Sequence, residues 1–163
     1  MTDAGKYAKL EAPRPTPADE ICACPGLTPV MLMTLLSSNP IHCAVCNLEV
    51  PPGRLDLSTS LVDAVASWNS VADAIYRLWL DSGAYETWAR DQLVDMNSSI
   101  NREGQRVRSE LNATRRCYYW HFREESGPLE GLRMNCPGCG HEMQIAAFTT
   151  FKRRICEPCS IIA

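Results

Sequence analysis

Residues 136–159 read CPGCGHEMQIAAFTTFKRRICEPC, and this stretch decides how the C-terminal part of the chain folds. It contains two Cys-x-x-Cys pairs, Cys136/Cys139 and Cys156/Cys159, separated by sixteen residues. A gap of this length is typical of a four-cysteine zinc site. Two residues between cysteines let the chain wrap one ion at Zn–S distances of about 2.3 Å. The stretch therefore predicts a zinc ribbon, with short strands near residues 144–148 and 151–155.

A second group of cysteines lies near the N-terminus, with Cys22 and Cys24 eighteen residues before Cys43 and Cys46. This spacing allows a second four-cysteine Zn²⁺ site. The single residue between Cys22 and Cys24 makes a tighter chelate than the usual two. We therefore expect one Zn²⁺ at the C-terminal pairs and treat a second at the N-terminal pairs as a hypothesis.

Other arrangements of these cysteines fit the same spacing. Cys22 and Cys24 could instead be small buried hydrophobic residues, and His42 could replace one of them as a ligand. In a rival pairing, Cys43/Cys46 share an ion with Cys136/Cys139, which leaves Cys156/Cys159 to another partner. Cys117 has no partner at zinc spacing, and we expect it in the core.

The predicted zinc is structural, and the chain is expected not to be an enzyme. Four sulfur ligands leave no open coordination position for water, and neither His-Glu-x-x-His nor the deaminase pattern occurs. A redox role needs a helix that begins at the cysteine pair, and no pair is placed to open one. An enzymatic alternative would pair His121 with Glu124 or Glu125, but no motif supports it.

Outside the cysteine pairs the sequence divides into four segments of an α+β fold. Residues 1–19 form a proline-rich arm that we expect to be mobile. Residues 20–57 form a small Cys-rich β lobe with a strand at 30–36, and residues 58–116 form a helical middle of about three helices. Residues 117–163 form the zinc-ribbon lobe, which opens with a strand at 117–122.

Periodicity places the helices within the middle segment. Apolar residues recur three and four apart from Leu61 to Trp79 and mark one face of a long helix. Ser60 with Asp63 resembles a capping pair for it, and Gly83 resembles a stop. Shorter helices are expected near residues 85–93 and 100–111, the latter capped by Ser98 or Ser99. Gly104 disfavours that last helix by about 1 kcal/mol.

Composition and charge restrict the classes of partner that the chain can bind. The 163 residues are 45% hydrophobic and carry a net charge of −3, which excludes a general polyanion binder. Residues 1–100 hold 6 basic against 12 acidic side chains, whereas residues 101–163 hold 10 against 7. The longest apolar run, residues 27–36, is about half of what a membrane crossing needs. We expect a cytoplasmic protein with no membrane contact and infer no small-molecule substrate.

Several motifs in a consistent order resemble a bacterial family of uncharacterised Zn-ribbon-containing proteins with a suggested role in nucleic-acid binding. The matching pieces span residues 20–160 and are Cys43-x2-Cys46 with Val50-Pro51, Leu78-Trp79-Leu80-Asp81-Ser82-Gly83, Tyr118-Tyr119-Trp120, Cys136-Pro137-Gly138-Cys139-Gly140 and Phe151-Lys152 with Cys156-x2-Cys159-Ser160. Family members tend to have an aromatic residue where this chain has Glu142-Met143-Gln144, and they are often longer at the N-terminus. The resemblance implies zinc at the C-terminal pairs and suggests nucleic-acid binding.

Two functional hypotheses follow. In the first, a non-catalytic zinc protein contacts DNA or RNA through basic residues of its C-terminal half, namely Arg106, Arg108, Arg115, Arg116, Lys152, Arg153 and Arg154. In the second, the zinc is purely structural and the acidic helical segment docks another, basic protein. Its candidate carboxylates are Asp63, Asp73, Asp81, Glu86, Asp91 and Asp95.

Overall fold

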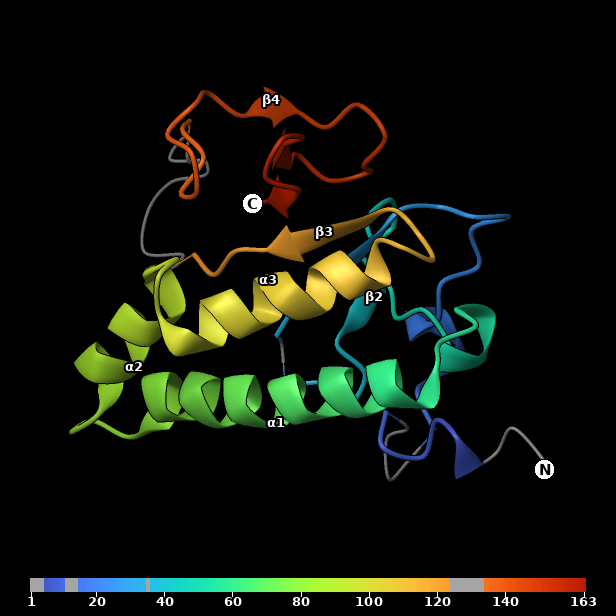
Figure 1. Ribbon diagram of the computed structural model, residues 1–163, viewed down its shortest axis with the longest axis horizontal. Coiled ribbons are helices and arrows are strands. Elements are labelled where there is room, and N and C mark those ends of the chain that lie inside the picture. The colour runs from blue at the N-terminus through green and yellow to red at the C-terminus, as the bar shows by residue number, and fades with distance from the viewer. Residues whose placement is uncertain (1–4, 11–14, 35, 124–133) are drawn as a thin grey trace.

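The structure is a computed structural model that describes residues 5–10, 15–34, 36–123 and 134–163. As predicted, the fold is mixed α+β, with one six-stranded sheet and three α-helices among the described residues. The helices are α1 (Thr59–Asp81), α2 (Glu86–Val94) and α3 (Ser99–Leu111). The strands are β1 (Val30–Leu32), β2 (Ile41–Cys43), β3 (Cys117–Trp120), β4 (Gln144–Ile145), β5 (Arg154–Cys156) and β6 (Ile161–Ile162). Figure 1 shows α3 along β3, with α1 beyond it and β4 on the opposite side.

One sheet joins the two cysteine-rich parts of the chain, in the strand order β2-β1-β3-β6-β5-β4. Strand β1 is antiparallel to β2 and parallel to β3, so that Val30 lies opposite both Cys43 and Cys117. Strand β3 is also parallel to β6, with Tyr119 opposite Ile161. Strands β5 and β4 continue the sheet in antiparallel pairs. The central strand β3 therefore links the N-terminal and C-terminal cysteine segments.

Both faces of the central strands are buried, which explains their apolar sequence. Side chains alternate between faces along a strand. Val30 and Leu32 belong to the main core with the helices, whereas Met31 packs with Tyr118 and Ile155 in a second core cluster. Phe148, from the turn between β4 and β5, packs against that second cluster and stacks on Tyr118 with ring centroids 5.8 Å apart. The C-terminal segment thus covers the sheet face that the helices do not.

Several local predictions were wrong in detail. The strands expected at residues 117–122, 144–148 and 151–155 are Cys117–Trp120, Gln144–Ile145 and Arg154–Cys156. The strand predicted over residues 30–36 ends at Leu32, because the chain turns: Leu36 has a φ of 58°, and the Asn69 amide donates to the carbonyls of Ser37 and Ser38. Residue 35 lies outside the described residues. Helix α1 is capped by Ser58 instead of Ser60, since the Ser58 hydroxyl accepts the Leu61 N–H at 3.2 Å.

The other helix signals agree with the structure. The buried face of α1 includes Leu61, Val65, Trp68 and Ile75, as the periodicity predicts. Gly83 follows the helix end with a φ of 60°. Of the two candidate caps for α3, Ser98 is the one whose hydroxyl accepts a helix N–H, from Asn101.

Gly104 allows α3 to pack closely against α1 and β3. A Cβ atom at this position would lie 2.4 Å from Cε2 of Tyr119 and 2.8 Å from Nε1 of Trp68. Trp68 and Tyr119 meet edge to face at 6.0 Å, and the Trp68 indole donates to the Ile100 carbonyl. The close packing that Gly104 permits therefore offsets the low helix propensity of glycine.

The part of residues 1–19 that the structure describes is anchored to the core. Tyr7 and Leu10 are buried in the main cluster, and the Lys9 ammonium pairs with Asp63 of α1 at 2.6 Å. A short 3-10 helix, η2 (Ala18–Glu20), leads into the first cysteines. Among the helices described, none combines the length and apolar character that a membrane crossing requires.

We expect Gly104→Ala to destabilise the protein although alanine favours helices. The steric clash with Tyr119 and Trp68 should outweigh a propensity gain of about 1 kcal/mol. The expected net loss is about 2 kcal/mol in the free energy of unfolding, measured by urea denaturation. Gly53→Ala is the matched control, because a Cβ atom there meets nothing within 4 Å, and its stability should stay within about 0.5 kcal/mol. Equal stability of both variants would contradict the packing described.

Candidate metal centres

The C-terminal cluster brings together the sulfurs of Cys136, Cys139, Cys156 and Cys159. Their four Sγ atoms all lie within 4.8 Å of one another, and Cys139 and Cys156 approach to 3.6 Å. A tetrahedron with Zn–S bonds of about 2.3 Å has edges of about 3.8 Å. The cluster therefore has the size of a single-ion site with four thiolate ligands.

The backbone around this cluster forms two tight turns. Gly140 follows Cys139 with a φ of 76°, and its N–H donates to the Cys136 carbonyl at 2.9 Å. Ser160 likewise follows Cys159 with a φ of 52°. The Gly138 amide donates to the Cys136 sulfur at 3.3 Å, and a Cβ atom on Gly138 would lie 3.4 Å from the Cys159 sulfur. The intervening amide thus stabilises a thiolate charge, as a metal–sulfur site requires.

The N-terminal cluster has the same donor set. The Sγ atoms of Cys22, Cys24, Cys43 and Cys46 also lie within 4.8 Å of one another. Its second pair repeats the turn of the C-terminal cluster: Cys43 ends β2, and Asn47 follows Cys46 with a φ of 65° and donates to the Cys43 carbonyl at 2.8 Å. The two clusters are therefore built on similar strand-to-turn units.

Arg54 holds the less usual Cys22-x-Cys24 pair. Its guanidinium donates to the Cys22 carbonyl at 2.7 Å and to the Cys24 carbonyl at 2.8 Å. The Cys22 N–H also donates to the Glu49 carbonyl. Two cysteines separated by one residue can thus face the same point, because an arginine fixes both peptide units. Sequence analysis missed Arg54, which is 30 residues from Cys24 and has no motif of its own.

The alternative ligand sets are not the ones in the structure. Cys43 and Cys46 belong to the N-terminal cluster and not to the one with Cys136 and Cys139. His42 Nδ1 contacts the Asn47 carbonyl oxygen at 3.0 Å, and His42 is outside the four-residue group. Cys117 is fully buried on β3, as expected, and burial raises the pKa of its thiol to about 12.

The thiols within each cluster differ in acidity. Backbone and side-chain hydrogen bonds with His141 lower the pKa of Cys139 to about 6, whereas burial raises the pKa of Cys159. In the N-terminal cluster burial raises the pKa of Cys46 to about 12. Burial also opposes ionisation of Cys43, yet hydrogen bonds led by one with the Cys46 amide bring its pKa down to about 7. Four neighbouring thiols cannot all ionise easily without a cation between them.

The turn between β4 and β5 is bonded to the N-terminal cluster. Both the N–H and the hydroxyl of Thr150 donate to the Val45 carbonyl, at 2.9 Å and 2.8 Å. Arg153 donates to the Asn47 side chain at 2.8 Å. Val45 lies between Cys43 and Cys46, and Asn47 follows them. We call these contacts, made by Thr150 and Arg153 to Val45 and Asn47, the inter-cluster latch.

Most of the basic residues proposed for nucleic-acid contact are engaged within the chain. Arg106 pairs with Glu103 and Glu110 on α3, and Arg116 pairs with Glu157 and donates to Ser160. The remaining arginines bind polar groups as follows: Arg108 the Gln105 side chain, Arg115 the Arg54 carbonyl, Arg153 the Asn47 side chain and Arg154 the Met143 carbonyl. Lys152 is exposed at the β4–β5 turn.

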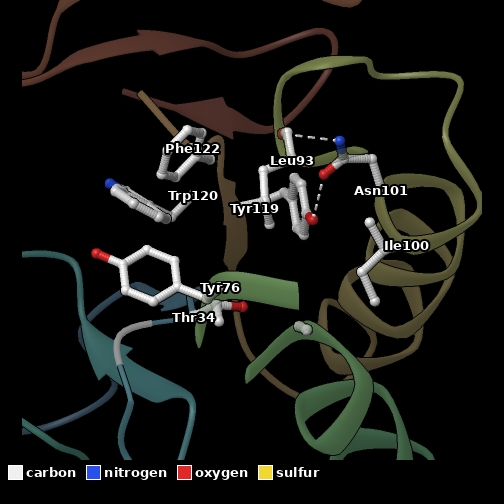
Figure 2. Close-up of a pocket in the computed structure, with 9 residues that line it drawn as sticks. Thr34, Tyr76, Leu93, Ile100, Asn101, Tyr119, Trp120 and Phe122 are labelled. Atoms are coloured by element: carbon white, nitrogen blue, oxygen red, sulfur yellow. Dashed lines mark hydrogen bonds between the residues drawn. The ribbon is translucent and has the colours of Figure 1, made fainter. Parts of the chain in front are cut away.

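A small cavity lies between the helices and β3, outside both cysteine clusters. Its volume of about 10 Å³ gives room for roughly one water molecule. Figure 2 shows the rings of Tyr76, Trp120 and Phe122 beside it and the Asn101 amide bonded to Tyr119 and Leu93. None of the eight clustered cysteines lines this cavity. It is too small for an organic substrate.

Comparisons with protein-family models, with curated proteins and with solved structures find no match to this chain. The resemblance described from the motifs thus identifies no family. What the structure shows is two four-cysteine clusters, each with the geometry of a metal site.

We expect Arg54→Gln to weaken metal binding at the N-terminal cluster selectively. Loss of the two carbonyl contacts frees the Cys22-x-Cys24 segment, and outer contacts of this kind are worth about 10–100-fold in metal affinity. Titration with Co²⁺, followed by its sulfur-to-metal absorbance, should show one weakened and one unchanged site.

Arg106→Gln is the matched control for this titration, because Arg106 is exposed and pairs with Glu103 and Glu110 of α3. Its two sites should titrate as in the wild type. Equal weakening of both sites in Arg54→Gln would contradict the assigned role of Arg54.

Proposed function

We propose that this chain is a non-catalytic protein that binds two Zn²⁺ ions, one in each four-cysteine cluster, and that both ions are structural. The observation that carries the proposal is the gathering of eight sulfurs into two groups of single-ion size. Tetrahedral sites of four soft thiolates suit zinc, which needs no further ligand there. Cys22, Cys24, Cys43 and Cys46 would hold one ion and Cys136, Cys139, Cys156 and Cys159 the other.

The donor chemistry supports a structural role over a catalytic one. Catalytic zinc keeps one position for water or substrate, whereas four protein ligands close the coordination sphere. When bound, the ion would supply the positive charge that lets four thiolates share a small volume. The chain's own contribution is to hold the sulfurs through the turns at Gly140, Asn47 and Ser160 and through Arg54.

Metal analysis with single cysteine variants tests this proposal. We expect two zinc ions per chain in the wild type and one in Cys139→Ser or Cys46→Ser. Each variant should also lose much of the affected part of the fold, since structural zinc contributes on the order of 10 kcal/mol. Mass spectrometry of the native protein gives the stoichiometry, and thermal melting gives the stability.

Cys117→Ala is the control, because Cys117 belongs to neither cluster. It should keep two zinc ions and lose only about 1 kcal/mol from the small cavity it leaves. Full zinc content in Cys139→Ser would refute the C-terminal site, and full content in Cys46→Ser would refute the N-terminal one. Visible absorbance from bound iron would refute zinc as the resident metal.

We also infer a weak contact with DNA or RNA at the β4–β5 turn. Lys152 is exposed there, and neighbouring Phe151 is 52% exposed, so the turn offers one cation and one ring for stacking. The arginines would have to leave carboxylate, amide and carbonyl partners to reach a phosphate backbone. Of the seven basic residues considered, Lys152 alone would reach a phosphate without leaving an internal partner.

The salt dependence of binding tests whether the protein makes one phosphate contact. With one counterion released, log K against log salt should have a slope of about −0.9 on duplex DNA. Lys152→Ala should abolish the slope, whereas Arg106→Ala should leave it unchanged. Fluorescence anisotropy with a labelled duplex measures both. A slope of about −5 or steeper would show that the arginines turn outward and would contradict the internal contacts.

A further inference from the structure

Two large aromatic side chains are exposed at α2. Tyr85, the residue before α2, is 61% exposed and Trp88 is 51% exposed. Leu80, near the end of α1, is 39% exposed. Only Ala89 and Leu93 of α2 are buried. The inner face of α2 is therefore packed, and two large aromatic rings stand on the side that the described chain leaves uncovered.

Acidic side chains continue the same face of α2. Tyr85, Trp88 and Asp91 follow one another at intervals of three residues, which places them on one side of a helix. Asp95 follows the end of α2, where one of its carboxylate oxygens accepts the Asn97 N–H at 2.9 Å. Between residues 81 and 95 the chain has four carboxylates against a single guanidinium. The guanidinium, Arg90, pairs with Asp91 at 3.2 Å, and both side chains are exposed. Such an exposed pair is weak and readily exchanged.

We propose that this face of α2 binds an arginine-bearing basic segment of another protein. A guanidinium can use both the aromatic rings and the carboxylates of this face, because it stacks on the faces of Trp and Tyr and donates to carboxylates. The exposed Trp88 and Tyr85 rings supply the stacking surface, and Asp91 and Asp95 supply the acceptors. The proposal rests on α2 and the residues that flank it, and on no property of the metal.

The negative charge of this face favours a basic segment over a nucleic acid, a membrane or a second copy of the chain. Nucleic acids and anionic membranes are repelled by the carboxylates of this face. A second copy of the chain would bring the same carboxylates together, since a two-fold interface sets a surface against itself. Figure 1 places α2 at the end of the helical layer, where the α1–α2 turn reaches the edge of the molecule. A basic segment of a partner protein fits both the charge and the rings.

The test uses the full zinc-loaded chain and a fluorescein-labelled peptide with three arginines spaced by pairs of glycines. We expect saturable binding by fluorescence anisotropy, weakened about tenfold in Trp88→Ala. Asp91→Lys should weaken it at least as much. The matching peptide with three lysines should bind several-fold more weakly, because lysine stacks less well on aromatic rings.

Two substitutions away from α2 are matched controls. Ile145→Ala removes an exposed apolar side chain of β4, and Asp19→Lys reverses an exposed charge in η2. Both should bind the arginine peptide within twofold of the wild type. Zinc content and melting temperature should be unchanged in all four variants, so that failure of the zinc sites is seen separately. Equal binding of both peptides, or binding that survives Trp88→Ala and Asp91→Lys, would overturn the proposal.

Discussion

The arrangement of the eight clustered cysteines is constrained by the mutual repulsion that thiolates would exert within one small volume. Two unit charges 4 Å apart repel by about 1 kcal/mol in water and about 4 kcal/mol near a protein surface. Each cluster holds four sulfurs at about that separation. Strands β2 and β5 have three residues each and end on a cysteine, and strands so short are not stable alone. A cation at the sulfurs would therefore also fix the ends of the strands.

The two clusters are parts of one architecture. Strand β3 joins β1 to β6, and the inter-cluster latch ties the β4–β5 turn to the turn at Cys43 and Cys46. The same turn carries Phe148 onto the second face of the sheet. Loss of order at one cluster would thus remove contacts that hold the other. For this reason the N-terminal and C-terminal segments are better described as two halves of a shared sheet than as separate ribbons.

Sequence patterns predicted those features of the fold and of the clusters that depend on residues close together in the chain. The cysteine spacing indicated both clusters, and the three- and four-residue periodicity indicated the buried face of α1. The error at Ser60 arose because Ser58 offers an equivalent hydroxyl two positions earlier. The order of the strands, the burial of Leu10 and the role of Arg54 could not be predicted in this way. Each depends on residues far apart in the sequence, and spacing rules do not cover such contacts.

The uneven charge along the chain has an internal explanation. Arg116 pairs with Glu157, between Cys156 and Cys159, and stacks at 4.7 Å on Tyr118, whose hydroxyl also donates to Glu157. Arg153 reaches the turn after Cys46 by donating to the Asn47 side chain. Four thiolates around one Zn²⁺ would carry a net charge of −2, which arginines near the clusters would offset. Two arginines of the C-terminal half, Arg106 and Arg116, thereby pair with carboxylates within the molecule, and four others are held by neutral acceptors.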